Sequence, residues 1–238
     1  REEYNPDLLV VNGENIAGGF GLTEKIVKTL FEDYKVDVIT TGNHWCDKTE
    51  IQTFGVNYPR MLLPANMYNV PSYKRGYYIG KTRTNLNYAV INLIGQAFMK
   101  GDNLSPFAMI DKILAELPRY ISHIIVDLHA EVTSEKQAMA HYLAGKVALL
   151  YGTHTHCQTS DERILEGKTA FITDVGMTGA FDSVIGMDKY ISLYNFTHRE
   201  RKPFKVAKKD LRLCAVYAKF DRSNHSCIKI ERVQKKVL

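Results

Sequence analysis

Short apolar runs recur along the chain at intervals typical of buried strands. They lie at Leu8–Val11, Val36–Ile39, Ala89–Leu93, His123–Leu128, Val147–Leu150 and Ala170–Ile172. A continuous apolar run of this length, rather than an alternating one, indicates a strand that is covered on both faces. The pattern therefore predicts a central sheet with parallel strands.

Helical patterns occupy several of the intervals between these runs. In Leu22–Tyr34 the apolar residues fall on one stripe and Thr23 is suited to cap the start. Residues Pro106–Leu117 form a second amphipathic stretch with Pro106 in the first turn, and Thr133–Lys146 form a third with Gly145 at its end. Strands and helices alternate, which predicts a layered α/β fold.

Two segments have a different rhythm. Residues 211–234 alternate large apolar and polar side chains on either side of "DRSNHS", and residues 73–95 do the same around Thr82–Asn87. Alternation around a polar turn is typical of an antiparallel hairpin. We therefore expect mixed sheets.

The composition limits the number of domains and the cellular compartment that we expect. A chain of 238 residues, 45% hydrophobic and 24% charged, fits one large α/β domain or at most two small ones. Its four cysteines include no C-x-x-C pair, which argues against a zinc-thiolate site and a disulfide framework. The apolar stretches are too short for a membrane span, and the N-terminus shows no signal-peptide pattern. We expect a soluble cytoplasmic protein that has no membrane partner.

The formal net charge is +5, and basic residues concentrate in "HRERKPFKVAKKD" at 198–210. Such a run raises the local concentration of anions without selecting a particular one. A solvated surface is the simpler interpretation of this basic run, and RNA binding is the alternative.

Polar side chains that bind metals follow four of the apolar strands. The clusters are "NGEN", "GNHW", "HAE" and "GTHTH", and they contain Glu14, Asn15, Asn43, His44, His129, His154 and His156. If these strands run in the same sense, their carboxyl ends converge and these side chains share one crevice. The co-occurrence of four clusters predicts a metal site.

Each cluster taken alone also fits a structural role. Glu14 suits a helix cap, Asn15 suits a left-handed turn, and His129 suits a satisfied core position. The pair His154 and His156 is more specific, because residues i and i+2 of an extended chain point the same way. Asp127, Asp174 and Glu131 are ambiguous between a supporting role and ordinary backbone pairing, and the remaining histidines are expected to be surface or helix residues.

Longer motifs carry a resemblance to a known family. The segments "VVNGENIAGGFGLT", "ITTGNHWCDK", "VDLHAEVTSEKQA", "YGTHTHCQTSD" and "AFITDVGMTGAFDSVIGMD" resemble the YmdB-type bacterial branch of the calcineurin-like metallophosphoesterases. The resemblance covers nearly the whole chain and is looser between residues 54 and 88. It implies a four-layer α/β/β/α sandwich with two mixed sheets. It also implies cyclic-nucleotide phosphodiesterase activity.

The resemblance assigns a first metal site. It implies that Glu14 bridges two metal ions and that Asn15 completes the first site with His156. The family also opens with a strand that ends in Gly-Asp, whose Asp binds this metal, and the present sequence starts after that point, at Arg1. We therefore expect one domain over residues 1–238 that lacks its first strand and helix.

The resemblance also assigns a second metal site and a proton donor. It implies that Asn43, His129 and His154 complete the second site and that His44 protonates the leaving oxygen. Oxygen and nitrogen ligands permit iron, manganese, cobalt or zinc. The resemblance favours two divalent or mixed-valence ions of iron or manganese.

Two positions depart from the family pattern. Relatives tend to carry Arg at the position of Gln96, and an aliphatic residue is commoner at the position of Cys157. Neither change removes a ligand, but Gln96 leaves the phosphate contacts and the substrate preference open.

The sequence thus predicts a dinuclear metal-dependent phosphodiesterase that acts on small phosphodiesters, in particular 2′,3′-cyclic nucleotides. The alternative is a catalytically weak regulatory or RNA-associated binding protein on the same fold. Apolar edge strands favour a homo-oligomer without specifying its symmetry.

Overall fold

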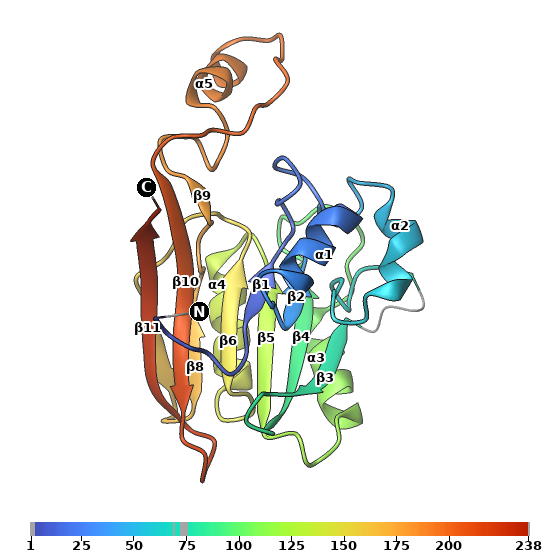
Figure 1. The fold of residues 1–238 in the computed structure, drawn as a ribbon, viewed down its shortest axis with the longest axis vertical. Helices are drawn as coiled ribbons and strands as arrows, with labels where there is room; N and C mark the ends of the chain where they lie inside the picture. Colours follow the sequence, from blue (N-terminus) through green and yellow to red (C-terminus); the bar gives the residue numbers. More distant parts are fainter. Residues whose placement is uncertain (1–2, 69, 72–75, 238) are drawn as a thin grey trace.

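A six-stranded mixed sheet forms the centre of the molecule in the computed structural model, which describes residues 3–68, 70–71 and 76–237 (Figure 1). In sheet order its strands are β3 (Tyr77–Lys81), β4 (Asn87–Ile94), β5 (His123–His129), β6 (Leu149–Thr153), β8 (Thr169–Ile172) and β7 (Arg163–Leu165). The inner strands β4, β5, β6 and β8 are parallel, while β3 and β7 pair antiparallel at the two edges. The parallel core explains the continuous apolar runs, since both faces of these strands are covered.

Two helices cover one face of this sheet. They are α3 (Pro106–Glu116) and α4 (Thr133–Leu143), and their buried residues Ile110, Ile113 and Met139 pack in one core with the sheet. Ser105 caps α3, because its hydroxyl accepts a hydrogen bond from the backbone N–H of Ala108.

Strand β5 shows how the sheet divides its side chains between two cores. Val126 and Leu128 belong to the core beneath α3 and α4. Ile125, Asp127 and His129 alternate with them and face the opposite side, where Ile125 packs against a second layer of strands. The pleat therefore directs His129 away from the helices and toward that layer.

The second layer contains a parallel pair and an antiparallel sheet. Strands β1 (Val10–Asn12) and β2 (Val38–Thr40) form the pair, while β9 (Gly179–Ala180), β10 (Leu211–Phe220) and β11 (Cys227–Lys236) form the other sheet. Val38 of β2, Val10 of β1 and Val216 of β10 lie in the same core as Ile125. The two layers of strands thus pack face to face.

Helices α1 (Glu24–Glu32) and α2 (Ile51–Phe54) lie on the outer side of β1 and β2, followed by a 3-10 turn at Gly55–Asn57. Val27, Leu30 and Phe54 pack with Ile39 of β2 in a third core. Helices, sheet, strands and helices therefore succeed one another, and the expected α/β/β/α sandwich with mixed pairing is confirmed. The second layer differs in detail, since its strands divide into a parallel and an antiparallel group.

Most elements expected from the sequence are present. Thr23 caps α1 through a 3.4 Å contact to the N–H of Ile26, and Gly145 follows α4 with a φ of 74°. Both hairpins form, as β3–β4 and β10–β11, although the beginning of the first expected hairpin, at 73–75, lies outside the described residues. Among the described helices, none combines the length and the apolar character needed to cross a membrane.

Besides the short elements α2, β7, β9 and the 3-10 turn, one longer helix was not expected. Helix α5 (Lys189–Thr197) lies between β9 and β10 at the tip of a protruding segment, well away from the layers (Figure 1).

Candidate metal centre

The carboxyl ends of four strands from both layers meet at one edge of the sandwich. The register of the large sheet places Ile94, His129 and Thr153 side by side at this edge, and β1 ends beside β2 with Asn12 opposite Thr40. The last residue of β5 and the loops that follow the other strands carry the residues expected to form the site. The topology therefore explains why clusters far apart in sequence lie close together.

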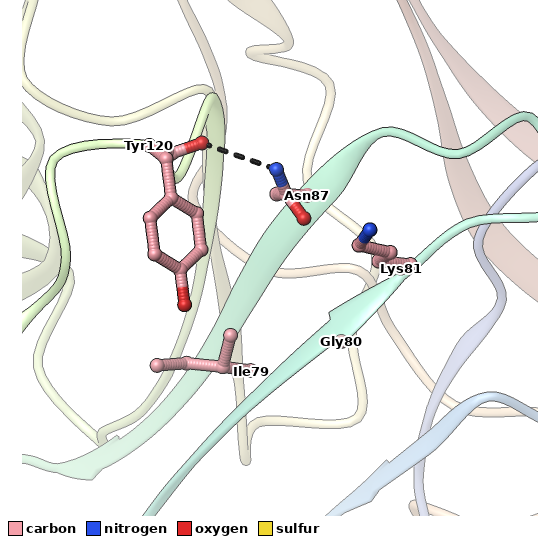
Figure 2. Close-up of a pocket in the computed structure, with 5 residues that line it drawn as sticks. All are labelled: Ile79, Gly80, Lys81, Asn87 and Tyr120. Carbon is pink, nitrogen blue, oxygen red and sulfur yellow. Dashed lines mark hydrogen bonds between the residues drawn. The ribbon is translucent and has the colours of Figure 1, made fainter.

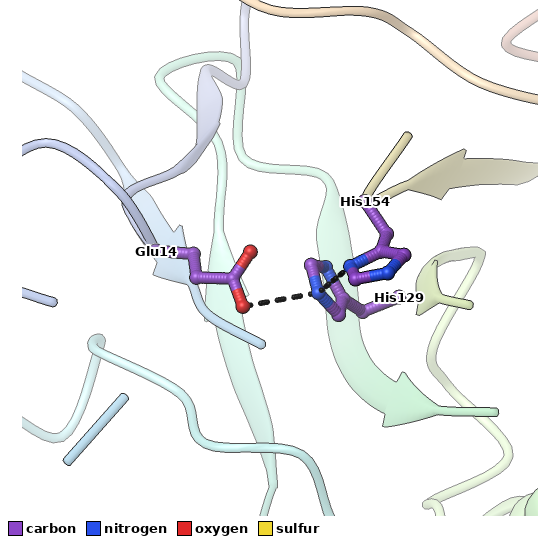
Figure 3. A group of neighbouring side chains, drawn as sticks. All are labelled: Glu14, His129 and His154. Carbon is purple, nitrogen blue, oxygen red and sulfur yellow. Dashed lines mark hydrogen bonds and ion pairs between the residues drawn. The ribbon is translucent and has the colours of Figure 1, made fainter. Parts of the chain in front are cut away.

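Glu14, His129 and His154 bring three ligand atoms to within 4.8 Å of one another (Figure 3). The Oε1 atom of Glu14 lies 3.0 Å from Nε2 of His129, and Nδ1 of His154 lies 3.0 Å from the same Nε2 atom. The side chains of Glu14 and His129 are almost fully buried, and that of His154 is 24% exposed. The cluster is therefore shielded from water and open on the side of His154.

Asn43 adds a fourth group, because its Oδ1 atom also lies 3.0 Å from Nε2 of His129. The tautomer of His129 follows from its other nitrogen. Thr153 donates its hydroxyl proton to Asp127 at 2.7 Å, so its oxygen accepts from Nδ1 of His129 at 3.0 Å. The Nε2 atom of the neutral ring then carries a lone pair, which faces the oxygen atoms of Glu14 and Asn43 and the Nδ1 atom of His154.

Such a group of lone pairs repels itself unless a cation lies among it. Metal–ligand bonds of about 2.1 Å at right angles place neighbouring ligand atoms about 3 Å apart, which is the spacing found around His129. The residues present thus fit a metal ion in both spacing and chemistry.

Asn15 and His156 form a second pair of candidate ligands. The Nδ2 atom of Asn15 lies 3.0 Å from Nε2 of His156, and the buried Oδ1 atom of Asn15 has no hydrogen-bond partner among the described residues. A half-turn of the Asn15 amide would exchange its two ends and bring the oxygen next to the imidazole. An orphaned buried oxygen beside an imidazole again fits a cation.

The backbone of the "GTHTH" loop is not extended. His154 has a φ of 105° and His156 a φ of 65°, in a region that few residues other than glycine adopt. The expectation that both rings point the same way as in an extended chain is therefore wrong. His154 reaches Glu131 with its Nε2 atom at 2.9 Å, whereas His156 turns to Asn15.

Thr155, between the two histidines, is held by a carboxylate. Asp174 accepts hydrogen bonds from the N–H of Thr155 at 3.1 Å and from its hydroxyl at 2.9 Å. Lys136 of α4 donates to the same Oδ2 atom at 2.8 Å, and both side chains are almost fully buried. The sequence left the role of Asp174 open, and the structure places it beneath the loop that carries both histidines.

Asp127 supports the site from below. It is fully buried and accepts from Asn12, Thr40 and Thr153, which links β1 and β2 to the large sheet. Burial raises the pKa of Asp127 above its ordinary value, although these hydrogen bonds oppose the shift.

Charge and burial act differently on two of the candidate ligands. Burial alone raises the pKa of Glu14, but the neighbouring His129 and the hydrogen bond from the N–H of His44 outweigh it and hold the pKa below its usual range. Burial lowers the pKa of His154, against the opposing carboxylates of Glu14 and Glu131. Both shifts favour the forms that bind metals, a carboxylate and a neutral imidazole.

His44, the expected proton donor, lies at the edge of this cluster. Its Nδ1 atom is 2.7 Å from Oδ2 of Asp47, and the ring of Phe20 meets it edge-on with centroids 5.3 Å apart. Because Asp47 accepts from Nδ1, Nε2 is the ring atom available for proton transfer. The sequence analysis did not predict that Asp47 orients the ring of His44. The only indication in the sequence was that Asp47 lies three residues after His44.

Gln96 and Cys157, the two departures from the family pattern, lie in loops around the site. The side chain of Gln96 donates to the carbonyl of Asn103 at 2.8 Å, so it takes part in loop packing. Cys157 is an exposed free thiol.

A pocket of about 320 Å³ adjoins the site and is lined by His156, Cys157, Met177, Phe181, Ser183 and Ile185, among others. A second pocket, of about 490 Å³, is lined by Ile79, Gly80, Lys81, Asn87 and Tyr120. In it the side chain of Asn87 donates to the carbonyl of Tyr120 at 3.4 Å (Figure 2). Asn87 begins β4, whereas the site residues follow the carboxyl ends of the strands, so only the first pocket belongs to the site.

Comparisons with known proteins cover nearly the whole chain. The sequence model of a family described as "YmdB-like protein" matches residues 1–233. A protein of Bacillus subtilis (strain 168) named 2′,3′-cyclic-nucleotide 2′-phosphodiesterase is 40% identical over 234 residues, which make up 98% of this chain and 87% of the relative.

Two crystal structures have the same fold. That of a novel phosphatase from Mycoplasma pneumoniae superimposes with a TM-score of 0.90 and 31% identity, and covers 99% of this chain and 84% of that one. That of a hypothetical protein from Thermus thermophilus gives a TM-score of 0.88 and 31% identity, and covers 97% of this chain and 88% of that one.

Proposed function

The chain belongs to the YmdB-like protein family, and from this premise we propose that it is a metal-dependent phosphodiesterase that hydrolyses 2′,3′-cyclic nucleotides. One observation carries the proposal. With His129 neutral, four side chains direct lone pairs at one another around its Nε2 atom, an arrangement that a bound cation would stabilise. The name of the Bacillus subtilis relative supplies the substrate class.

The ligand set supports two metal ions. Glu14, with two carboxylate oxygens, would bridge them, and Asn15 and His156 would hold the first. Asn43, His129 and His154 would hold the second. Divalent ions bound there would neutralise the phosphoryl oxygens and activate water as the nucleophile. The all-oxygen and nitrogen set suits iron or manganese, which we expect.

The reaction adds one water to the cyclic diester. A bond forms between the water oxygen and phosphorus, the bond between phosphorus and O2′ breaks, and O2′ takes up a proton, which leaves a 3′-phosphate. His44 would deliver that proton from Nε2, because Asp47 fixes the ring through Nδ1 at 2.7 Å. The pocket beside His156 would receive the nucleoside.

Metal content and turnover test the proposal together. We expect about two metal ions per chain by elemental analysis, and hydrolysis of 2′,3′-cyclic AMP that chelation abolishes. His154→Ala should lower both the metal content and the rate at least a hundredfold in kcat/KM. His141→Ala, on the exposed side of α4, is the matched control and should change neither.

Full metal-dependent turnover in His154→Ala would contradict the assigned ligand. A metal-loaded wild-type protein without turnover would favour the alternative of a regulatory binding protein.

We also propose that the protein is a cytoplasmic homo-oligomer. Exposed apolar side chains at Leu211 and Leu213 of β10 and at Ile228 of β11 support self-association along this sheet. Light scattering during size-exclusion chromatography would measure the number of chains in the particle.

A further inference from the structure

Residues 183–209 form an arm that stands off from the layered body and carries α5 at its tip (Figure 1). Its base is a two-stranded stalk. The N–H of Asp188 donates to the carbonyl of Lys205 at 2.8 Å, and the N–H of Ala207 donates to the carbonyl of Gly186 at 2.9 Å. The arm is thus an ordered extension with defined pairing.

The excess of positive charge in the protein is concentrated on the arm. Residues 198–209 contain six of the 31 Lys and Arg residues and one of the 26 Asp and Glu residues, which leaves 25 of each sign elsewhere. All six cationic residues are exposed, and none forms an ion pair with a carboxylate of the described chain. Cations gathered on one projection without carboxylate partners attract a polyanion.

Helix α5 exposes three large apolar side chains and buries two polar ones. Tyr190, Leu193 and Phe196 are 72%, 61% and 80% exposed, while Ser192 and Asn195 are buried. Asn195 faces inward because its side chain bonds the backbone N–H and carbonyl of Lys202. Exposed aromatic rings beside exposed cations are the combination on which unpaired bases of single-stranded nucleic acids stack.

The stalk connects the arm to the candidate metal centre. His156 donates from Nδ1 to the carbonyl of Ile185 at 2.8 Å, and the methyl group of Met187 packs so closely on Gly19 that a Cβ there would lie 2.5 Å from it. Ile185 also lines the pocket beside His156. A chain bound along the arm would therefore end at the site.

We propose that the arm binds single-stranded RNA and that the enzyme hydrolyses the 2′,3′-cyclic phosphate at the 3′ end of an oligoribonucleotide. This inference rests on the proposed function and extends its substrate from a mononucleotide to an RNA end. Strand cleavage by a ribose 2′-hydroxyl leaves such a terminus. The step itself is unchanged, since water adds to phosphorus, the bond to O2′ breaks and O2′ takes the proton.

The arm adds affinity for the nucleotides on the 5′ side of the reacting group. Cations would contact their phosphates, and the rings of Tyr190, Phe196 and Phe204 would stack on their bases. For single strands, the logarithm of the binding constant falls by about 0.7 per phosphate contacted for each tenfold rise in salt concentration. If the arm contacts three phosphates, kcat/KM for the oligonucleotide should therefore fall about 20-fold between 50 and 200 mM salt. Hydrolysis of 2′,3′-cyclic AMP should be far less sensitive.

The test compares 2′,3′-cyclic AMP with an eight-nucleotide RNA that ends in a 2′,3′-cyclic phosphate. We expect the wild-type protein to prefer the RNA at least tenfold in kcat/KM at 50 mM salt. The triple variant Arg199→Gln, Lys205→Gln and Lys208→Gln should lose that preference and keep its rate on 2′,3′-cyclic AMP. The control variant Lys25→Gln, Lys112→Gln and Arg119→Gln removes the same charge from exposed positions elsewhere and should keep the preference.

Equal kcat/KM for the two substrates, or an arm variant that keeps the RNA preference, would overturn the proposal. A changed particle mass in the arm variant with unchanged kinetics would also overturn it, and would assign the arm to a contact between copies of the chain. If neither substrate is hydrolysed, the proposed function fails and the arm is judged by binding alone. Fluorescence anisotropy with a labelled eight-nucleotide RNA ending in a 3′-phosphate then decides, because only binding that the arm variant loses supports the arm.

Discussion

Lys136 and Asp174 form an ion pair at 2.8 Å with both side chains 1–2% exposed, directly beneath the loop that carries His154 and His156. A buried charge is stable only with its partner, so the pair fixes α4 to the start of the loop after β8. Asp174 in turn holds Thr155, whose neighbours both have positive φ angles. The pair therefore acts on the site through the backbone of the loop.

Replacement of the lysine should expose this dependence. Lys136→Met keeps the length of the side chain but leaves a buried carboxylate unpaired, and should destabilise the fold by about 3–5 kcal/mol in urea unfolding. The double variant Lys136→Met and Asp174→Asn should recover part of this loss, because no unpaired charge remains. Lys112→Met on the exposed face of α3 should change stability by less than about 0.5 kcal/mol. Equal stabilities of the two lysine variants would contradict a structural role for the pair.

His44→Gln should separate protonation of the leaving group from metal binding. We expect kcat on 2′,3′-cyclic AMP to fall about 10²–10⁴-fold, the usual contribution of a general acid, with the metal content unchanged. The rate on bis-p-nitrophenyl phosphate should fall much less, because p-nitrophenolate leaves without a proton. A parallel loss on both substrates would show that His44 serves binding and not proton transfer.

Gly42 should tolerate no side chain. A Cβ at this position would lie 2.3 Å from Nε2 of His129 and 2.5 Å from Oε1 of Glu14, so Gly42→Ala must displace candidate ligands. We expect loss of bound metal measured by elemental analysis and loss of turnover. Gly179→Ala is the matched control, since a Cβ there meets nothing within 4 Å. Normal metal content in Gly42→Ala would show that the ligand atoms can move apart without loss of the site.

His123 should make the metal-free protein sensitive to acid. Burial, and then the charge of the neighbouring His225, lower the pKa of His123 from its ordinary 6.5. As the pH falls through 6.5 the unfolded chain therefore takes up a proton that the folded state resists, and stability falls.

Urea unfolding of the metal-free protein at pH 7.5, 6.5 and 5.5 measures this slope. His123→Gln should make the free energy of unfolding less dependent on pH. His154, whose pKa is also lowered, accounts for part of the pH dependence that the variant retains. Identical slopes for wild type and variant would contradict a contribution from His123.

The hydrophobic pattern was sufficient to predict a layered α/β fold, because burial leaves a strong pattern, whereas the four-layer arrangement was predicted from the family resemblance. Strands such as β4 and β5 are covered on both faces and appear as continuous apolar runs, and α1 and α3 show a single apolar stripe. Helix α5 was missed because it packs in no core of the described chain, and its exposed apolar face gives no periodic signal of burial. Helix α2 is a single turn and too short to show one.

The proximity of the candidate ligands was predictable from the sequence, but their geometry was not. Strand ends in a parallel sheet converge, which is enough to group Glu14, His129 and His154. The positive φ angles that turn His154 and His156 to different partners depend on Asp174, which lies 19 residues from Thr155. The burial of Lys136 could not be predicted from the helical pattern, because its ion-pair partner is 38 residues away.

The candidate ligands are spread over both strand layers, from Glu14 after β1 to His154 after β6. Neither layer alone supplies all of them, so the complete set exists only after the two layers have docked. Metal uptake would therefore be a late event in folding, and the rate at which refolding protein captures metal would report on the docking of the layers and not on the formation of either one.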